Sequence, residues 1–331
     1  MAEKNILQIL FGGITIKGDM AKIVVIDSGI SPQFETGEQR SYKIDDGKLI
    51  KSESVDNNGH GTYVNQLIQY ASDKRCLITN YRLLNNELRG KSKDLLIMLE
   101  NIPEDTDIIN LSLSTPMTDS VKDLERICEK LIRKDILIIA SVSNKNQISY
   151  PAEFSSAFGV KGEFFKKSEK IRYEINGKFY IVADKTPIVV KSVDGGFTFF
   201  GGNSKSTAYV SGVLAKIIKG KGSNLSSFLN EINQIMAIDM YDIHDFEYYP
   251  NNKNYDINKI ETIKLICENT FQMKYEDYAN LRVGKIFTNE NCTLTKLLHS
   301  LMNELRFSMD NRLIRITDFK NAYSIYDAFN L

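Results

Sequence analysis

The segment Lys22-Ile-Val-Val-Ile-Asp27-Ser-Gly29 decides the fold of the first half of this chain, because it joins a compact apolar run to an acidic residue and a turn. The apolar run at 23–26 predicts a buried strand. In parallel α/β folds, functional side chains lie at the carboxyl ends of such strands, where Asp27 falls. Asp27 is therefore a candidate site residue, and a turn-capping aspartate is the alternative.

Short β-rich runs alternate with amphipathic helices from residue 20 to about residue 220. Further strands are expected at 76–84, 108–113 and 136–142, and helices at 62–71, 92–101, 120–134 and 206–220. Continuous apolar strands separated by helices predict an α/β fold with a mostly parallel sheet covered on both faces. Asn176-Gly177 and Asp194-Gly195 predict two hairpins, with positive φ at both turn positions.

Two later segments place a histidine and a serine in settings suited to chemistry. In Asn57-Asn-Gly-His60-Gly-Thr62 the histidine lies between glycines before a predicted helix, and its ring suits proton transfer near neutral pH. In Gly201-Gly-Asn-Ser204-Lys-Ser-Thr-Ala208 the serine follows glycines and opens a helix, close to backbone N–H groups. An N-cap serine is the alternative for Ser204, and Ser206 is a second N-cap candidate.

The ordered set Asp27, His60 and Ser204 resembles the subtilisin-like serine proteases (subtilases), whose triad has the same chain order. The subtilase pattern Gly-Thr-Ser-x-Ala-x-Pro-x-Val-x-Gly lies over residues 202–212 without a gap. Three positions depart from it, namely Asn203, Ser206 and Ala208. The resemblance covers about residues 20–218. It implies a subtilisin-like fold with Ser204 as nucleophile, His60 as general base and Asp27 as the residue that orients His60.

The resemblance also implies an oxyanion hole and a substrate-binding strand. Ile138-Ile-Ala-Ser-Val-Ser-Asn144 is similar to the family's strand ending Ala-Ala-Gly-Asn, with Asn144 as the oxyanion donor and Ser143 in place of glycine. Ile109-Asn-Leu-Ser-Leu-Ser114 resembles the strand against which an extended substrate adds as a further strand. A Tyr-Pro-Ala segment borders the S1 pocket in the family. The expected substrate-binding residues are Ser112, Leu113, Ser114, Tyr150, Pro151 and Ala152.

The composition changes after about residue 222. We expect a peptidase domain at 1–240, a linker at 241–257 and a small all-α bundle of three amphipathic helices at 258–331. The bundle weakly resembles an acyl or peptidyl carrier domain. Thr293 stands where a carrier would hold its phosphopantetheine serine, so no prosthetic group is expected. The alternative is a bundle that packs on the protease or docks a protein partner.

The overall charge and the lengths of the apolar runs argue against nucleic-acid and membrane partners. Lysine and arginine together number 42, as do aspartate and glutamate, so the net charge is zero and gives no reason to expect a nucleic-acid or membrane partner. No apolar run reaches the roughly 18 residues of a membrane span. We interpret the apolar run at 6–14 as part of the mature fold rather than as a signal peptide.

The cysteines indicate a reducing compartment. Cys76, Cys128, Cys267 and Cys292 are scattered and form no Cys-x-x-Cys pair, so a zinc site is not expected. The sequence has no calcium-loop signature either, so no metal ligand is assigned, although a calcium site built from backbone carbonyls would not be visible in a sequence. Reduced thiols in a cytosolic protein are favoured over disulfides. No propeptide of the family's size precedes Asp27, which fits an intracellular enzyme. The expectation is a cytoplasmic protein without a cofactor.

Together these features predict an intracellular subtilisin-like serine endopeptidase that cleaves a dedicated peptide or protein, as in peptide maturation. Asn144 and the Ser204 backbone N–H would bind the oxyanion. One alternative is an acyl transferase or peptide ligase that uses the same triad. The other is a pseudo-protease that acts as a binding module, which the departures at Asn203 and Ser143 motivate.

Overall fold

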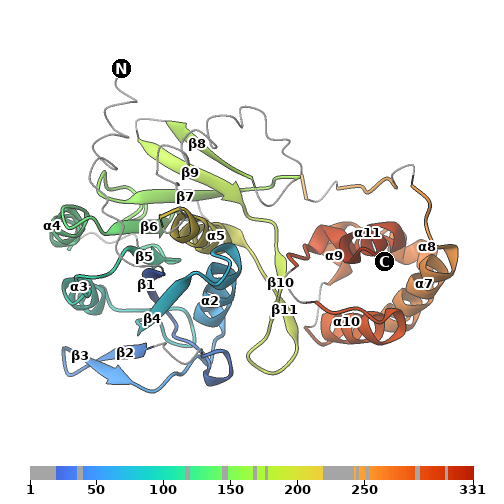
Figure 1. Cartoon of the computed structure of the whole chain (residues 1–331), viewed down its shortest axis with the longest axis horizontal. Coiled ribbons are helices and arrows are strands. Elements are labelled where there is room, and N and C mark those ends of the chain that lie inside the picture. The colour runs from blue at the N-terminus through green and yellow to red at the C-terminus, as the bar shows by residue number, and fades with distance from the viewer. Residues whose placement is uncertain are drawn as a thin grey trace. The chain divides into compact units, whose positions relative to one another are not determined.

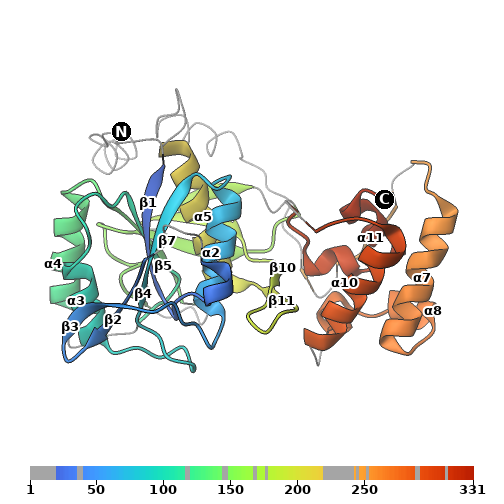
Figure 2. The same ribbon diagram turned by 60° about the horizontal axis from the view of Figure 1, so that its bottom comes forward.

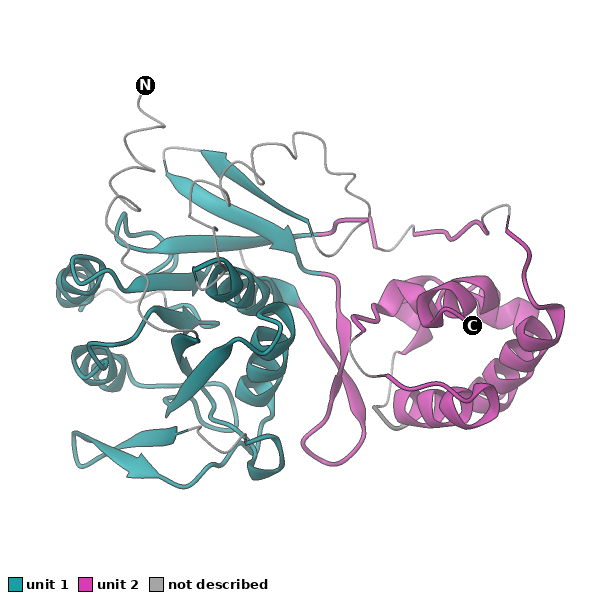
Figure 3. Ribbon diagram, viewed as in Figure 1, with its two compact units in different colours: residues 1–163, 167–185, 202–238 teal, residues 164–166, 186–201, 239–331 magenta. Residues whose placement is uncertain are grey.

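The computed structural model describes residues 20–35, 40–115, 120–143, 148–166, 170–175, 178–218, 242–243, 246–250, 253–287, 291–309 and 312–331. The chain divides into two compact units (Figure 3). Unit 1 comprises residues 1–163, 167–185 and 202–238, and unit 2 comprises residues 164–166, 186–201 and 239–331. The apolar run at 6–14 lies outside the described residues.

Unit 1 is built on a nine-stranded sheet with the order β3-β2-β4-β1-β5-β6-β7-β9-β8. The seven inner strands, β2-β4-β1-β5-β6-β7-β9 in sheet order, are parallel to one another. The edge strands β3 and β8 are antiparallel to their neighbours β2 and β9. The strands are β1 (Ala21–Asp27), β2 (Arg40–Asp45), β3 (Lys48–Ser52), β4 (Cys76–Arg82), β5 (Ile108–Leu111), β6 (Leu137–Ser141), β7 (Phe158–Glu163), β8 (Ile171–Ile175) and β9 (Phe179–Asp184). In β1 every residue except Lys22 is buried, as a central parallel strand requires.

Helices cover both faces of this sheet. Helices α2 (His60–Ala71) and α5 (Gly202–Ile218) lie on one face, and α3 (Ser92–Glu100) and α4 (Val121–Ile132) lie on the other (Figures 1 and 2). A short 3-10 turn, η1 (Pro32–Phe34), follows β1. The predicted α/β fold with a mostly parallel sheet is therefore confirmed.

The predicted helix at 206–220 begins earlier than the sequence indicated. Helix α5 starts at Gly202, which has a φ of +77°, so Ser204 lies in its first turn, in agreement with the expectation that this serine opens a helix. Both predicted hairpins have paired antiparallel strands, β8 with β9 and β10 with β11. The Asn176-Gly177 turn lies outside the described residues. In the other turn only Gly195 has a positive φ and Asp194 does not, because the loop between these strands is longer than a two-residue turn.

Unit 2 combines a β-hairpin with helices. Strands β10 (Ile188–Lys191) and β11 (Phe197–Phe200) are antiparallel. The helices are α7 (Ile257–Phe271), α8 (Tyr275–Ala279), α9 (Val283–Ile286), α10 (Asn291–Leu305), η2 (Ile316–Phe319) and α11 (Ala322–Phe329). The three predicted amphipathic helices are present, and their apolar faces share one core. Helices α8 and α9 are too short for a periodic pattern to reveal them.

The hairpin belongs to the same core as the helices. The Phe197 N–H donates to Thr295 Oγ1 at 2.8 Å, and the Val189 N–H donates to Ile314 O at 2.7 Å. The Phe199 ring lies against Phe287, with centroids 5.0 Å apart. The boundary expected at 241–257 stays a prediction, but the grouping of residues 186–201 with the C-terminal helices was not visible in the sequence.

Candidate active site

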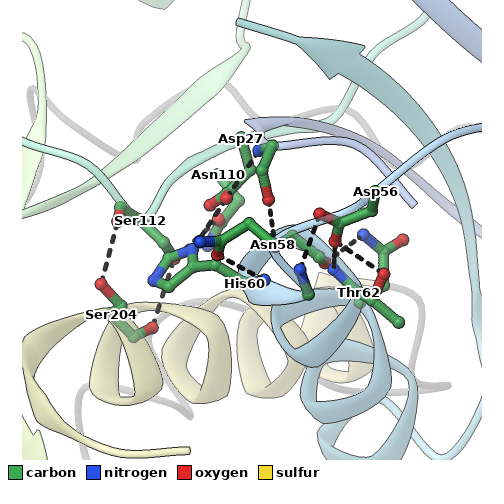
Figure 4. Close-up of polar contacts among 12 residues, drawn as sticks. Asp27, Asp56, Asn58, His60, Thr62, Asn110, Ser112 and Ser204 are labelled. Atoms are coloured by element: carbon green, nitrogen blue, oxygen red, sulfur yellow. Dashed lines mark hydrogen bonds and ion pairs between the residues drawn. The ribbon is translucent and has the colours of Figure 1, made fainter. Parts of the chain in front are cut away.

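The Asp27 carboxylate holds the imidazole of His60. Asp27 ends β1 and His60 begins α2, and His60 Nδ1 lies 2.7 Å from Asp27 Oδ1 (Figure 4). The Ser28 N–H donates to the same oxygen at 2.7 Å. Since a carboxylate oxygen accepts both hydrogen bonds, His60 Nδ1 bears a proton and Nε2 is the nitrogen that can accept one. The contact therefore fixes the tautomer that a general base needs.

Two glycines let the turn after β1 approach the start of α2. Gly29 has a φ of +109°, and a Cβ there would lie 2.2 Å from Val55 O. A Cβ on Gly61 would lie 2.3 Å from Gly29 O. The Gly61 N–H in turn donates to Ser28 Oγ at 2.8 Å. The glycines beside Asp27 and His60 are thus required by close backbone contact between their two segments.

Asp56 organises the loop before His60, and sequence reasoning missed it. Its Oδ1 accepts the Gly59 N–H at 2.8 Å, and its Oδ2 accepts the Thr62 N–H at 2.8 Å and the Thr62 hydroxyl at 2.7 Å. Asp56 is buried, and these bonds satisfy N–H groups at the start of α2. An acidic residue four positions before the histidine, at a helix start, was the sequence feature that could have identified it.

The protonation of His60 follows from its neighbours. Burial of the ring lowers the pKa of His60, but the charge of Asp27, the hydrogen bond to Asp27 and the charge of Asp56 outweigh burial, so that this pKa lies above its ordinary value of 6.5. The side chain is 18% exposed, and His60 lines a surface cleft. A histidine in this environment is a suitable proton acceptor at neutral to mildly alkaline pH.

Ser204 lies in the same cleft as His60. It is in the first turn of α5, where backbone N–H groups lack a helical acceptor. Figure 4 shows the His60 side chain between Asp27 and Ser204, and both His60 and Ser204 line the cleft. The Ser204 hydroxyl donates to Ser112 O at 2.9 Å, and the Ser112 hydroxyl donates to Ser204 O at 3.2 Å. The segment after β5 therefore holds the first turn of α5 beside the cleft.

The cleft has a volume of about 800 Å³. One side is formed by the segment after β5, including the expected substrate-binding residues Ser112, Leu113 and Ser114. Four leucines also line the cleft, namely Leu83, Leu84, Leu88 and Leu95. Arg89 and Lys91 are the charged side chains of its lining, apart from His60, among the residues that the structure describes. The arrangement leaves an extended groove beside Ser204.

The Tyr-Pro-Ala segment lies next to this groove without lining it. Tyr150 pairs with Thr115, a lining residue, through two backbone hydrogen bonds of 2.9 and 3.2 Å. Pro151 and Ala152 are buried, and the peptide bond between Tyr150 and Pro151 is cis. A substrate role for these three residues stays a prediction. Asn144 lies outside the described residues, and so does the geometry of its expected oxyanion contact.

The described residues contain no group of three or more histidine, cysteine or acidic side chains that could hold a metal ion. Cys76, Cys128 and Cys267 are free and buried. In that same part of the chain, no helix has both the length and the apolar composition that a membrane crossing demands.

Comparison with known proteins identifies the class. The model of the subtilase family matches residues 18–231, well over half of the chain. The chain therefore belongs to the subtilase family of serine proteases. The match covers the residues that form the Asp27, His60 and Ser204 constellation. The carrier-like layout of the C-terminal helices finds no support in these comparisons.

Two curated relatives carry protease names. The minor extracellular protease Epr of Bacillus subtilis is 31% identical over 157 residues, which are 44% of this chain and 24% of that protein. An intracellular serine protease of Paenibacillus polymyxa is 25% identical over 224 residues, 61% of this chain and 67% of that protein. The chain thus spans about a quarter of the first relative and two thirds of the second.

Solved structures agree on the fold. The crystal structure of a cold adapted subtilisin-like serine proteinase superposes with a TM-score of 0.50 at 21% identity, covering 66% of this chain and 83% of that one. Sphericase gives a TM-score of 0.50 at 19% identity, covering 69% of this chain and 87% of that one. At these identities the likeness establishes a shared subtilisin-like fold.

Proposed function

We propose that this protein is a serine endopeptidase that uses Ser204 as nucleophile, His60 as general base and Asp27 to orient His60. The observation that supports this most directly is the 2.7 Å contact between Asp27 and His60 in the cleft that also holds Ser204. The names of the two protease relatives point the same way. No single contact would suffice, since each of these residues alone has a structural alternative.

The reaction begins with a rotation of the serine. In the structure the Ser204 hydroxyl donates to Ser112 O, so it turns toward His60 before it reacts. As Ser204 Oγ attacks the peptide carbonyl carbon, His60 Nε2 takes the hydroxyl proton and the carbonyl oxygen becomes an oxyanion. His60 then gives the proton to the leaving amine, which leaves an acyl group on Ser204 Oγ. Water attacks this acyl carbonyl as His60 Nε2 takes its proton, and His60 returns that proton to Ser204 Oγ as the new carboxyl product leaves. Asp27 stabilises the imidazolium throughout.

The oxyanion needs donors that are aimed before the reaction starts. The Ser204 backbone N–H, in the first turn of α5, is one proposed donor, and the Asn144 side chain is the second. Removing one such donor typically costs about 10²–10³ in turnover. Asn144 is assigned by resemblance alone.

The cleft favours a particular kind of substrate. The leucines in its lining suit an extended peptide with an aliphatic or aromatic side chain, and Arg89 and Lys91 suit a peptide that also carries an acidic side chain. Arg89 also lies 3.5 Å from Glu87, so Lys91 contributes the less compensated charge. We propose a dedicated peptide or protein substrate, processed inside the cell as in peptide maturation. The intracellular relative supports that location.

A fluorophosphonate probe read out by intact mass tests the proposal. We expect one adduct on the wild type and none on Ser204→Ala. Ser206→Ala is the matched control, because Ser206 is two residues away but fully buried, and it should still be labelled. An unlabelled wild type would favour a pseudo-protease that acts by binding. A labelled protein whose peptide products lack the added mass of water would favour acyl transfer over hydrolysis.

A further inference from the structure

Asn203 and Lys205, which flank Ser204 in the sequence, both make side-chain contacts with the strands beneath α5. Successive residues of an α-helix point about 100° apart, so when Ser204 faces the cleft, Asn203 and Lys205 diverge from it on either side. Asn203 is 6% exposed and Lys205 is fully buried. The resemblance to the subtilases assigns no role to either residue, and Asn203 stands where the family pattern has threonine.

Asn203 joins the ends of two adjacent parallel strands to α5. Its Nδ2 donates to Val142 O, just after β6, at 2.8 Å. Its Oδ1 accepts the N–H of Gly162, within β7, at 2.9 Å. A Cβ on Gly162 would lie 2.6 Å from Asn203 Oδ1, so this close approach depends on glycine. A side-chain amide can donate and accept at once, which this bridge requires.

Lys205 makes the second attachment through a buried ion pair. Its Nζ donates to Asp184 Oδ2 and to Asp184 O, both at 2.8 Å. Asp184 ends β9, the strand beside β7, and the two side chains are 1% and 0% exposed. Lysine is seldom fully buried, and it then needs a partner of this kind. Because Asp184 holds the ammonium, Lys205 is not positioned as a base for Ser204.

We propose that Asn203 and Lys205 are positioning residues that fix the first turn of α5 to strands β6, β7 and β9, and so hold the Ser204 hydroxyl and N–H in reacting geometry. This inference rests on the proposed function. The attachments lie on both sides of the nucleophile and prevent the first turn from rotating or sliding. A misplacement of about 1 Å at a reacting group can cost about 100-fold in rate.

The test measures the rate of fluorophosphonate acylation per folded molecule, together with kcat and KM on a cleaved peptide. Lys205→Met keeps the length of the side chain and removes its charge. We expect acylation and kcat to fall at least tenfold with KM changed less than twofold, because substrate contacts are kept while the nucleophile moves. The double variant Lys205→Met/Asp184→Asn should recover part of this loss, since no unpaired buried charge remains.

A matched control is available in unit 2. Lys320 is also buried, with 2% exposed, and its Nζ donates to Leu281 O at 3.0 Å and pairs with Glu247 at 3.1 Å. Lys320→Met should lower the melting temperature and leave acylation per folded molecule intact. If Lys205→Met behaves in the same way, the positioning role is wrong and the ion pair is structural.

A second variant covers the case in which Lys205→Met does not fold. Asn203→Ala removes both bonds of the bridge without leaving a charge, and we expect acylation to fall about tenfold. An unchanged acylation rate in a folded Asn203→Ala protein would overturn the proposal. Failure of the wild type to react at all would instead contradict the proposed function, so the two failures are distinguishable.

Discussion

Units 1 and 2 both pack helices around an apolar core, yet they bury different polar groups. Unit 1 places Asp27 and Asp184 at the ends of parallel strands, and pairs them with His60 and Lys205. The core of unit 2 is apolar and aromatic, with Phe319 fully buried near Phe199 and Phe287. Among its described residues Lys320 is the buried charged side chain.

This difference indicates that the buried polar groups of unit 1 serve activity, whereas the buried aromatic groups of unit 2 serve folding stability. A buried charge is costly unless it is paired, and replacement of such a pair by apolar residues is often neutral or stabilising. One pair in unit 1 contains His60, and the other contains Lys205, the sequence neighbour of Ser204, so we explain both pairs by positioning and proton transfer rather than by stability. In unit 2 the aromatic contacts need only burial. The comparison predicts that variants in unit 1 change activity first, and that variants in unit 2 change stability first.

The largest effect is expected for Asp27→Asn. The amide is nearly the same size, but it can donate to His60 Nδ1 and so favour the wrong tautomer. We expect kcat to fall about 10³–10⁴-fold, as for the equivalent change in the serine protease triad. Steady-state kinetics on a cleaved peptide, with circular dichroism to verify folding, would measure it. A loss smaller than tenfold in a folded protein would show that Asp27 does not orient the base.

Phe319→Ala is the corresponding change in unit 2. Phe319 is fully buried and contacts Phe199, Phe287 and Phe329 at ring distances of 5.4 to 6.3 Å. Truncation should cost about 3–5 kcal/mol of folding free energy through lost burial and an internal cavity. Thermal or urea unfolding would measure it. Fluorophosphonate acylation should keep its rate in the folded fraction, and a fall there would break the comparison by linking unit 2 to the nucleophile.

The sequence was sufficient for those parts of the site that are local. The apolar run before Asp27, and the glycines beside His60 and Ser204, each require their conformation within a few residues of chain. These segments predicted the strand that ends at Asp27 and the helices that follow His60 and Ser204, although α2 and α5 begin two and four residues earlier than expected. The parallel sheet followed from the alternation of strands and helices in the same way.

Contacts between distant segments could not be predicted. Lys205 and Asp184 are 21 residues apart and Asn203 and Val142 are 61 apart, and nothing in either sequence position specifies its partner. The aromatic residues of β11 fit any apolar surface, so their pattern could not reveal that the hairpin packs with the C-terminal helices. Asp56 was missed although its partners Gly59 and Thr62 are only three and six residues away, because its contacts depend on the left-handed turn at Gly59.

The smallest effect expected is a change in pH dependence, and it tests the electrostatics of unit 1 directly. His60 must be neutral to accept a proton, and its pKa lies above 6.5 because Asp27 and Asp56 outweigh the opposing effect of burial. The acylation rate should therefore fall as the pH decreases, with a midpoint above 6.5. Asp27→Asn removes the larger favourable charge and should move the midpoint to lower pH. NMR titration of the His60 ring nitrogens would measure both proteins.

The same shift has a defined consequence for stability. Because the pKa of His60 is raised on folding, its protonation stabilises the native state below the unfolded value of about 6.5, and this contribution disappears as the pH rises through the folded value. Wild type should therefore exceed Asp27→Asn in unfolding free energy by more at pH 6 than at pH 9. Lys320→Met in unit 2 removes no contact with a histidine, so its deficit in unfolding free energy should be nearly the same at both pH values. A deficit for Asp27→Asn that is larger at pH 9 would mean that burial, rather than the Asp27 carboxylate, dominates the protonation of His60.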